Sequence, residues 1–213
     1  MAVIDPYATT EEYRARVDKS DTSDDAILLP QLKAASRFIR HKCGRFFTKD
    51  ASAVARLLNG SDAVRVGTRL LINDVADLTG LVVKVDLDGD HDFDEAEETL
   101  TKGTHYWVGP ANADKGDEPE PYRWLDIMPN NGRLVKWTDA LNSVEVTAIF
   151  GWPSVPEMIA ELTVGITRQI HDLQISGATL QMANIESAIS MDDRLPKLLY
   201  DAMLQYGRKE LFA

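Results

Sequence analysis

The stretch 144–157 places the end of a strand pattern and the start of a helix pattern within a few residues. Up to Phe150, every second residue is apolar, a period near two that is typical of a half-buried strand. From Val155 onward, apolar residues recur at steps of three and four, which is the period of one helix face. Gly151 and Pro153 separate the two patterns, because neither residue readily continues a strand or a helix. The sequence therefore predicts a sharp joint between a sheet and a helix.

Helix patterns also occur towards both ends of the chain. Thr9 and Glu12 have capping-box spacing, which predicts a short helix over 11–17. A longer helix is predicted from about Ser23 to Cys43, in which Pro30 favours either a kink or a start near Leu28. A last helix is predicted over 195–209; because terminal helices are ordered only when they pack on something, it needs a partner face in the fold or on another molecule.

The central region changes to a period of two, interrupted by turn residues. The predicted strands are Val54–Leu58 and Val64–Ile72, forming a hairpin around Asn59-Gly60, then Leu81–Val85, Thr104–Val108, Tyr122–Ile127, Arg133–Trp137 and Val144–Phe150. We therefore predict an α+β fold, in which a small helical bundle formed by 1–50 and 151–213 carries a large antiparallel β insertion at 51–150.

Composition limits the possible classes. The chain has 213 residues, enough for one core with a sizeable insertion, and it has no apolar run long enough to span a membrane. Its N-terminus lacks a signal-peptide pattern, so we expect a cytosolic protein at synthesis. The single cysteine, Cys43, excludes an internal disulfide and a multi-cysteine zinc site, and its position on an apolar helix face predicts core packing.

Acidic residues concentrate in one segment. Residues 86–98 carry eight Asp and Glu side chains and no Lys or Arg, and without these eight charges the net charge of −11 becomes −3. Asp86, Asp88, Asp90, Asp92 and Glu97 have the spacing of calcium ligands in an EF-hand loop. His91 stands where that loop requires glycine, and a strand pattern precedes the segment. Two interpretations stay open: a calcium-binding turn, or a solvated acidic hairpin tip.

Catalytic patterns are missing from the sequence. Its four histidines have no metalloprotease spacing, and no nucleophile elbow, phosphate-binding loop or dinucleotide fingerprint occurs. Basic residues line one side of the second predicted helix, at Lys33, Arg37 and Arg40. This side is either a solvated face or a contact surface for phosphate or an acidic neighbour, and without a nucleic-acid motif we do not assign DNA binding.

Several short motifs resemble the head-tail connector (adaptor, or head completion) proteins of long-tailed bacteriophages. They are Ala35-Ser36-x-Phe38-Ile39, Cys43-Gly44-Arg45-Phe46-Phe47, Asp86-x-Asp88-Gly89-Asp90, Tyr106-x-x-x-Pro110-x-Asn112, Pro121-Tyr122 and, as the strongest match, Val146-Thr147-Ala148-Ile149-Phe150-Gly151-Trp152-Pro153-x-Val155-Pro156. Together they cover most of residues 7–175, and the C-terminal segment matches least.

The resemblance implies a structural virion protein that is not an enzyme and needs no cofactor. Such proteins form a ring, usually dodecameric, beneath the portal protein and above a tail or stopper protein, and packaged DNA passes through the lumen without sequence recognition during ejection. The implied location is the virion, at the head-tail interface, after assembly in the host cytoplasm, with no membrane partner. A competing hypothesis is a soluble calcium-dependent binding module that uses the segment 86–98.

A head-to-tail ring requires two different complementary patches on each subunit. We expect the basic side of the second helix and the acidic segment to supply them, and the last helix to meet the portal. The predicted interface residues are Arg37, Arg40, Arg45, Asp88, Asp90, Trp152, Leu195, Leu199, Met203 and Tyr206.

Overall fold

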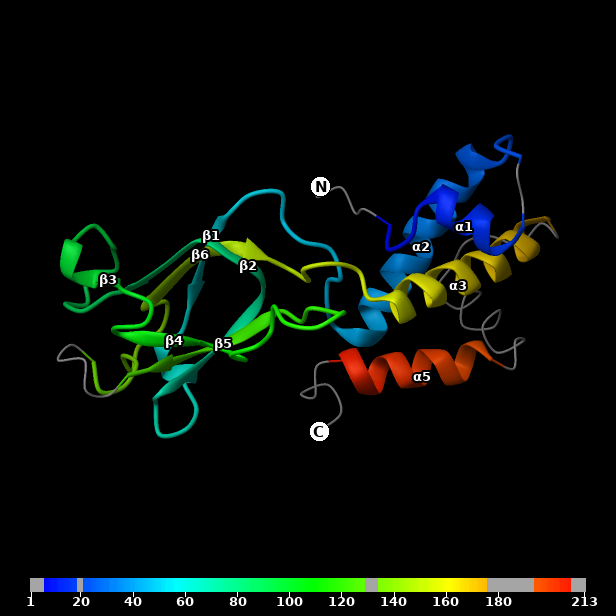
Figure 1. The fold of residues 1–213 in the computed structure, drawn as a ribbon. Coiled ribbons are helices and arrows are strands. Elements are labelled where there is room, and N and C mark those ends of the chain that lie inside the picture. The colour runs from blue at the N-terminus through cyan, green and yellow to red at the C-terminus, as the bar shows by residue number, and fades with distance from the viewer. Residues whose placement is uncertain (1–5, 19–20, 129–133, 176–193, 208–213) are drawn as a thin grey trace. The chain divides into compact units, whose positions relative to one another are not determined.

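The computed structural model describes residues 6–18, 21–128, 134–175 and 194–207. Within these residues, four α-helices and a six-stranded antiparallel sheet form an α+β fold in which the strands are inserted between helices (Figure 1). The α+β prediction is thus confirmed. The chain divides into two compact units: a helical unit of residues 1–47 and 155–213, and a sheet unit of residues 48–154. None of the described helices combines the length and apolarity needed to cross a bilayer.

The helical unit begins with α1 (Thr10–Arg16). The Thr9 hydroxyl accepts a hydrogen bond from the Glu12 N–H at 3.1 Å, and the Glu12 carboxylate accepts one from the Thr9 N–H at 2.7 Å. This reciprocal pair satisfies two backbone donors that the helix itself leaves unbonded, so the predicted capping box is confirmed.

The long helix α2 (Asp25–Cys43) contains Pro30 in its interior. The helix begins five residues before the proline, so the alternative start near Leu28 is wrong. Gly44 ends it with φ of 64° and donates its N–H to the Arg40 carbonyl, as expected for a left-handed cap. The predicted apolar stripe is buried along its length; its members are Leu28, Leu32, Ala35, Ile39 and Cys43.

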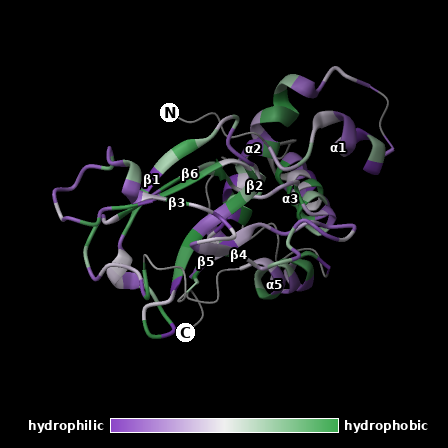
Figure 2. Cartoon of the chain, turned by 60° about the vertical axis from the view of Figure 1, so that its left-hand side comes forward, coloured by the Kyte–Doolittle hydropathy of each residue, from purple (hydrophilic) through white to green (hydrophobic). Residues whose placement is uncertain are grey.

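Two further helices, α3 (Glu157–Ile175) and α5 (Leu195–Tyr206), pack against α2 and against each other. Leu195 lies over Gly165, where an added Cβ would sit 2.6 Å from the leucine Cδ2. The close approach of α5 to α3 therefore depends on the absence of a side chain at Gly165. Helices α2, α3 and α5 each carry both hydrophobic and hydrophilic residues, as Figure 2 shows.

The sheet unit has strand order β1-β6-β2-β5-β4, with β3 paired to β2 outside this path. The strands are β1 (Val54–Leu58), β2 (Arg69–Val85), β3 (Thr99–Leu100), β4 (Tyr106–Gly109), β5 (Tyr122–Ile127) and β6 (Val144–Phe150), and the 3₁₀ turns are η1 (Gly60–Asp62) and η2 (Ala96–Glu98). Strand β6 has the predicted bounds, and its alternate residues Val144, Val146, Ala148 and Phe150 are buried in the sheet core.

Three strand predictions are wrong. The first strand does not form a hairpin with the next one, because β1 pairs with β6 at the far end of the insertion. The strands predicted over 64–72 and 81–85 are not separate, because residues 69–72 and 81–85 belong to one long strand, β2, which begins at Arg69 and has register shifts along its length. Described residues 134–137 of the strand predicted over 133–137 are irregular, and the two-residue strand β3 was not predicted.

Candidate interaction surfaces

The basic face of α2 is formed by Lys33, Arg37 and Arg40, which follow one another at helical spacing. Arg37 is exposed, whereas Lys33 and Arg40 are half-buried. The Arg40 guanidinium carbon lies 3.5 Å from the ring centroid of Phe46, and this ring is 51 % exposed. The basic face therefore ends beside an exposed aromatic ring that helps to position one of its arginines.

Arg45 does not belong to this face. It was predicted to be an interface residue, but it is only 9 % exposed. The Arg45 side chain is buried, so the positive charge of the basic face comes from Arg37 and its neighbours on α2.

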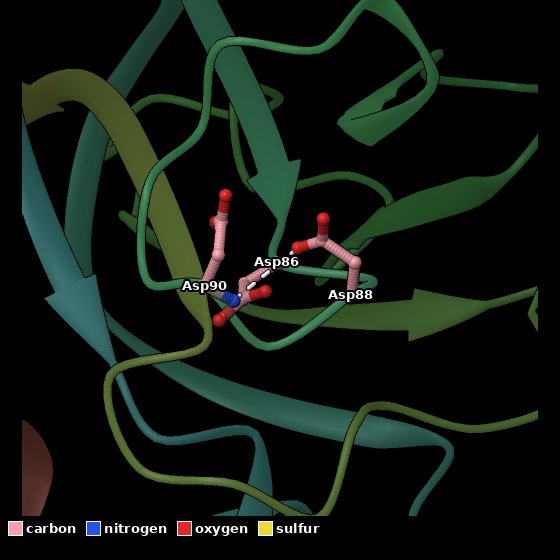
Figure 3. A group of neighbouring side chains, drawn as sticks. All are labelled: Asp86, Asp88 and Asp90. Carbon is pink, nitrogen blue, oxygen red and sulfur yellow. Dashed lines mark hydrogen bonds between the residues drawn. The ribbon is translucent and has the colours of Figure 1, made fainter.

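The acidic loop comprises residues 86–98 and connects β2 to β3. Asp86 at its start is buried, 4 % exposed, and its carboxylate accepts the Gly89 N–H at 2.6 Å. Asp88 in turn accepts the Asp90 N–H at 3.3 Å (Figure 3). These turns bring the carboxylate oxygens of Asp86, Asp88 and Asp90 to within 4.8 Å of one another.

A second group in the acidic loop consists of Asp90, Asp92 and Glu95, whose carboxylate oxygens also lie within 4.8 Å of one another. Four of the five predicted calcium ligands thus belong to the two groups, whereas Glu97 belongs to neither. The EF-hand spacing did not indicate Glu95. The only indication of Glu95 in the sequence is that it is one more acidic residue, two positions before Glu97.

The acidic loop differs from an EF-hand in the ways that the sequence indicated. Strand β2 ends at Val85, immediately before Asp86, so a strand and not a helix leads into the loop. His91 occupies the position of the EF-hand glycine and adopts the left-handed conformation, with φ of 68°. Its Nδ1 lies 3.5 Å from the Asp86 carboxylate.

Glu95 has an unusual environment in the acidic loop. A hydrogen bond from its own backbone lowers its pKa, but loss of hydration and the neighbouring carboxyl groups of Glu98 and Asp94 raise it by more. The resulting pKa is about 7. The carboxyl groups of this loop are thus close enough to disfavour one another's ionised forms.

Helix α5 packs within the helical unit by one face. Leu195 and Tyr206 are buried there, at 5 % and 6 % exposure, and Leu199 and Met203 are half-buried. The opposite face carries Tyr200 and Leu204 as large exposed side chains. The exposed surface of α5 therefore differs from the set of residues predicted for it, because two of the four predicted residues belong to the unit's own core.

The joint after β6 is sterically tight. Gly151 has φ of 116° and forms a β-bridge with Lys49, and a Cβ at this glycine would lie 2.1 Å from the Thr48 carbonyl oxygen. Trp152, which follows it, is 5 % exposed. Only glycine fits at position 151, which explains why the strand pattern ends there.

Two of the histidines make structural contacts. His171 Nδ1 lies 3.3 Å from the Gln31 amide oxygen, which joins α3 to α2. His105 Nδ1 accepts the Thr101 N–H at 2.8 Å in the turn before β4.

The fold is similar to that of one chain in a solved structure described as "Neck of empty GTA particle computed with C6 symmetry". The alignment covers 88 % of this chain and 92 % of that chain, with a TM-score of 0.48 and 19 % sequence identity. A likeness of this strength does not establish a function. No protein-family model matches the chain, and no curated protein matches it.

Proposed function

We propose that this chain is a structural protein of the head-tail neck of a tailed, phage-like particle, and that it acts without catalysis. The observation that carries the proposal is the connector-like motif over 146–156. Its residues form the end of β6 and the turn that returns the chain to α3. The motif therefore occupies the joint between an inserted sheet and a helical frame, the arrangement that the resemblance implies.

In this proposal, copies of the chain form a ring beneath the portal and above a tail or stopper protein, and DNA passes through the lumen. A ring built from head-to-tail contacts needs two patches that differ from each other. The basic face of α2 and the acidic loop are oppositely charged and belong to different units of the chain. We assign the contact between neighbouring subunits to these two patches.

Charge reversal tests this contact. Changing Arg37 and Arg40 to Glu should weaken assembly, because the reversed face then meets an acidic loop of like charge. Changing Asp94 and Glu97 to Lys in the same chain should restore it. Both acids are exposed and lie outside the first carboxylate group, Asp86 with Asp88 and Asp90.

The measurement is sedimentation velocity across a range of salt concentrations. The control reverses Lys115 and Lys136 to Glu, two exposed lysines outside both patches, and should sediment as the unmodified chain does. The Arg37/Arg40 variant should be dissociated. If the variant that carries all four charge reversals is dissociated as well, the two patches do not form the contact between subunits.

A second candidate function is a soluble calcium-dependent binding module, favoured by the grouped carboxylates of the acidic loop. The two functions predict different assembly states. A module stays monomeric with or without calcium and binds its partner only with the ion, whereas a neck protein assembles into a ring.

A further inference from the structure

The acidic loop buries two acidic side chains, and the described residues bring few basic groups to it. Glu98 is 2 % exposed, although it belongs to the most acidic segment of the sequence. Its Oε1 accepts the Leu87 N–H at 3.2 Å, while its Oε2 is buried and has no hydrogen-bond partner. Asp86 is also buried, and the one basic side chain within ion-pair distance of it among the described residues is the exposed His91 imidazole, which is charged only when protonated. A buried carboxylate without a counter-charge is strongly unfavourable.

The Glu98 carboxylate lies close to the two groups of acids but belongs to neither. Its hydrogen bond to the Leu87 N–H holds it beside the backbone that joins Asp86 to Asp88. Its carboxyl group also interacts with that of Glu95, a member of the second group. Lys84 brings one positive charge to the loop, where its ammonium donates to the Phe93 carbonyl oxygen at 2.5 Å, against the eight acidic side chains of residues 86–98.

We propose that the acidic loop binds one calcium ion through the carboxylates of Asp86, Asp88 and Asp90, and that the ion compensates the buried charge of Glu98. Calcium takes six to eight oxygen ligands in flexible geometry, which suits carboxylates arranged along a loop, whereas magnesium requires a strict octahedron. The ion would join the end of β2 to the start of β3 and so order the segment between them. This site does not depend on the proposed neck function.

Calorimetric titration of the full chain, stripped of metal with a chelator, tests the site. Calcium should bind with a Kd on the order of 10⁻⁵ to 10⁻³ M and at least about tenfold more tightly than magnesium. A hundredfold excess over Kd should raise Tm by roughly 5–10 °C. Absence of calcium binding up to 10 mM, at about the weakest end of this range, or equal binding of magnesium, would overturn the proposal.

Two variants and a control locate the ion. Asp88→Asn with Asp90→Asn should abolish binding, whereas Asp117→Asn, an exposed acid in another loop, should leave it unchanged. Glu98→Gln keeps an acceptor for the Leu87 N–H and removes only the charge. It should weaken calcium binding by about tenfold, and its Tm in chelator should equal or exceed that of the unmodified chain.

These outcomes separate a charge role for Glu98 from a structural one. If Glu98→Gln lowers Tm in chelator and leaves calcium affinity unchanged, Glu98 serves only as an acceptor and the charge-compensation assignment is wrong. If the Asp88/Asp90 variant binds calcium like the unmodified chain, the ion is bound elsewhere. A chain that binds calcium but does not form rings would retain this site and lose the neck function.

Discussion

The ring of Tyr206 on α5 packs edge-on against the ring of Phe47, with the two centroids 5.9 Å apart and the ring planes at 85°. Tyr7 packs on the same Phe47 ring in the same manner, at 5.5 Å. Three segments that are distant in the sequence thus meet at one fully buried aromatic ring. The C-terminal helix is therefore a structural part of the helical unit.

Truncating Tyr206 should destabilise the helical unit. Tyr206→Ala removes a buried ring, so the free energy of unfolding should fall by about 3 kcal/mol in a urea titration followed by circular dichroism. Leu204→Ala is the matched control, because Leu204 lies on the same helix and is 61 % exposed; its effect should stay within about 0.5 kcal/mol. Equal effects of the two substitutions would show that α5 does not pack as described.

Substitution of Gly151 should lower the free energy of unfolding far more than substitution of another glycine with a similar backbone conformation. Gly151→Ala places a Cβ against the Thr48 carbonyl, so we expect a loss of at least about 3 kcal/mol. Gly116 has φ of 103° but nothing within 4 Å of an added Cβ, so Gly116→Ala should cost only about 1–2 kcal/mol. Thermal unfolding of both variants measures the difference, and similar losses would mean that strain alone, without the contact to Thr48, sets the cost.

A bidentate ion pair joins β2 to β5. Arg69 donates through Nε and Nη2 to the two carboxylate oxygens of Asp126, at 2.7 and 2.6 Å, and the side chain of Arg69 is 15 % exposed. Arg69→Lys cannot keep both bonds and should cost about 1 kcal/mol of stability. Arg123→Lys, which alters the more exposed pair with Glu120, should change stability by less than about 0.5 kcal/mol. Chemical denaturation of the two variants in parallel would contradict this ranking if Arg123→Lys were the more damaging.

The Cys43 thiol should be unreactive towards alkylating reagents in the folded chain. Burial raises the pKa of its thiol to about 11, with Arg45 opposing the shift. At pH 8.5, alkylation should be slow in buffer and rapid in urea, where the thiol regains its ordinary pKa near 8.5. Rapid labelling of the folded chain would contradict the burial of this helix face.

The same shift predicts a loss of stability in alkali. Because the folded pKa lies above the unfolded one, the contribution of Cys43 is complete below about pH 8.5 and is lost as the pH rises towards 11. Tyr106, with a pKa raised to about 12 by burial, acts in the same direction. Cys43→Ala should therefore flatten, but not abolish, the decline of the unfolding midpoint above pH 9.

Local patterns in the sequence predicted the elements whose environment is uniform. Strand β6 is flanked by strands on both sides and buries every second residue, so its bounds could be predicted to the residue. The buried stripe of α2 and its Gly44 cap were predictable for the same reason. The pairing of β1 with β6 could not be predicted, because the two strands are separated by most of the insertion and no local sequence pattern indicates the pairing.

The acidic loop shows a similar limit. The spacing of Asp86, Asp88 and Asp90 was readable as a ligand pattern, and the fold brings these carboxylates together. From the sequence, Glu98 is expected to be as exposed as Glu97. The only indication of its burial is that it lies two residues before the buried Leu100 of β3, a spacing that places two residues on the same face of a strand. Burial of a charged residue results from tertiary contacts, which composition and spacing do not contain.

The most direct test of the neck function is electron microscopy of purified particles that contain this chain, with the chain tagged after residue 116 in an exposed loop of the sheet unit. If the chain is a neck protein, a closed ring of tagged subunits appears at the junction between head and tail, below the portal. A particle that carries the tag elsewhere, or joined heads and tails that lack it, would contradict the neck function.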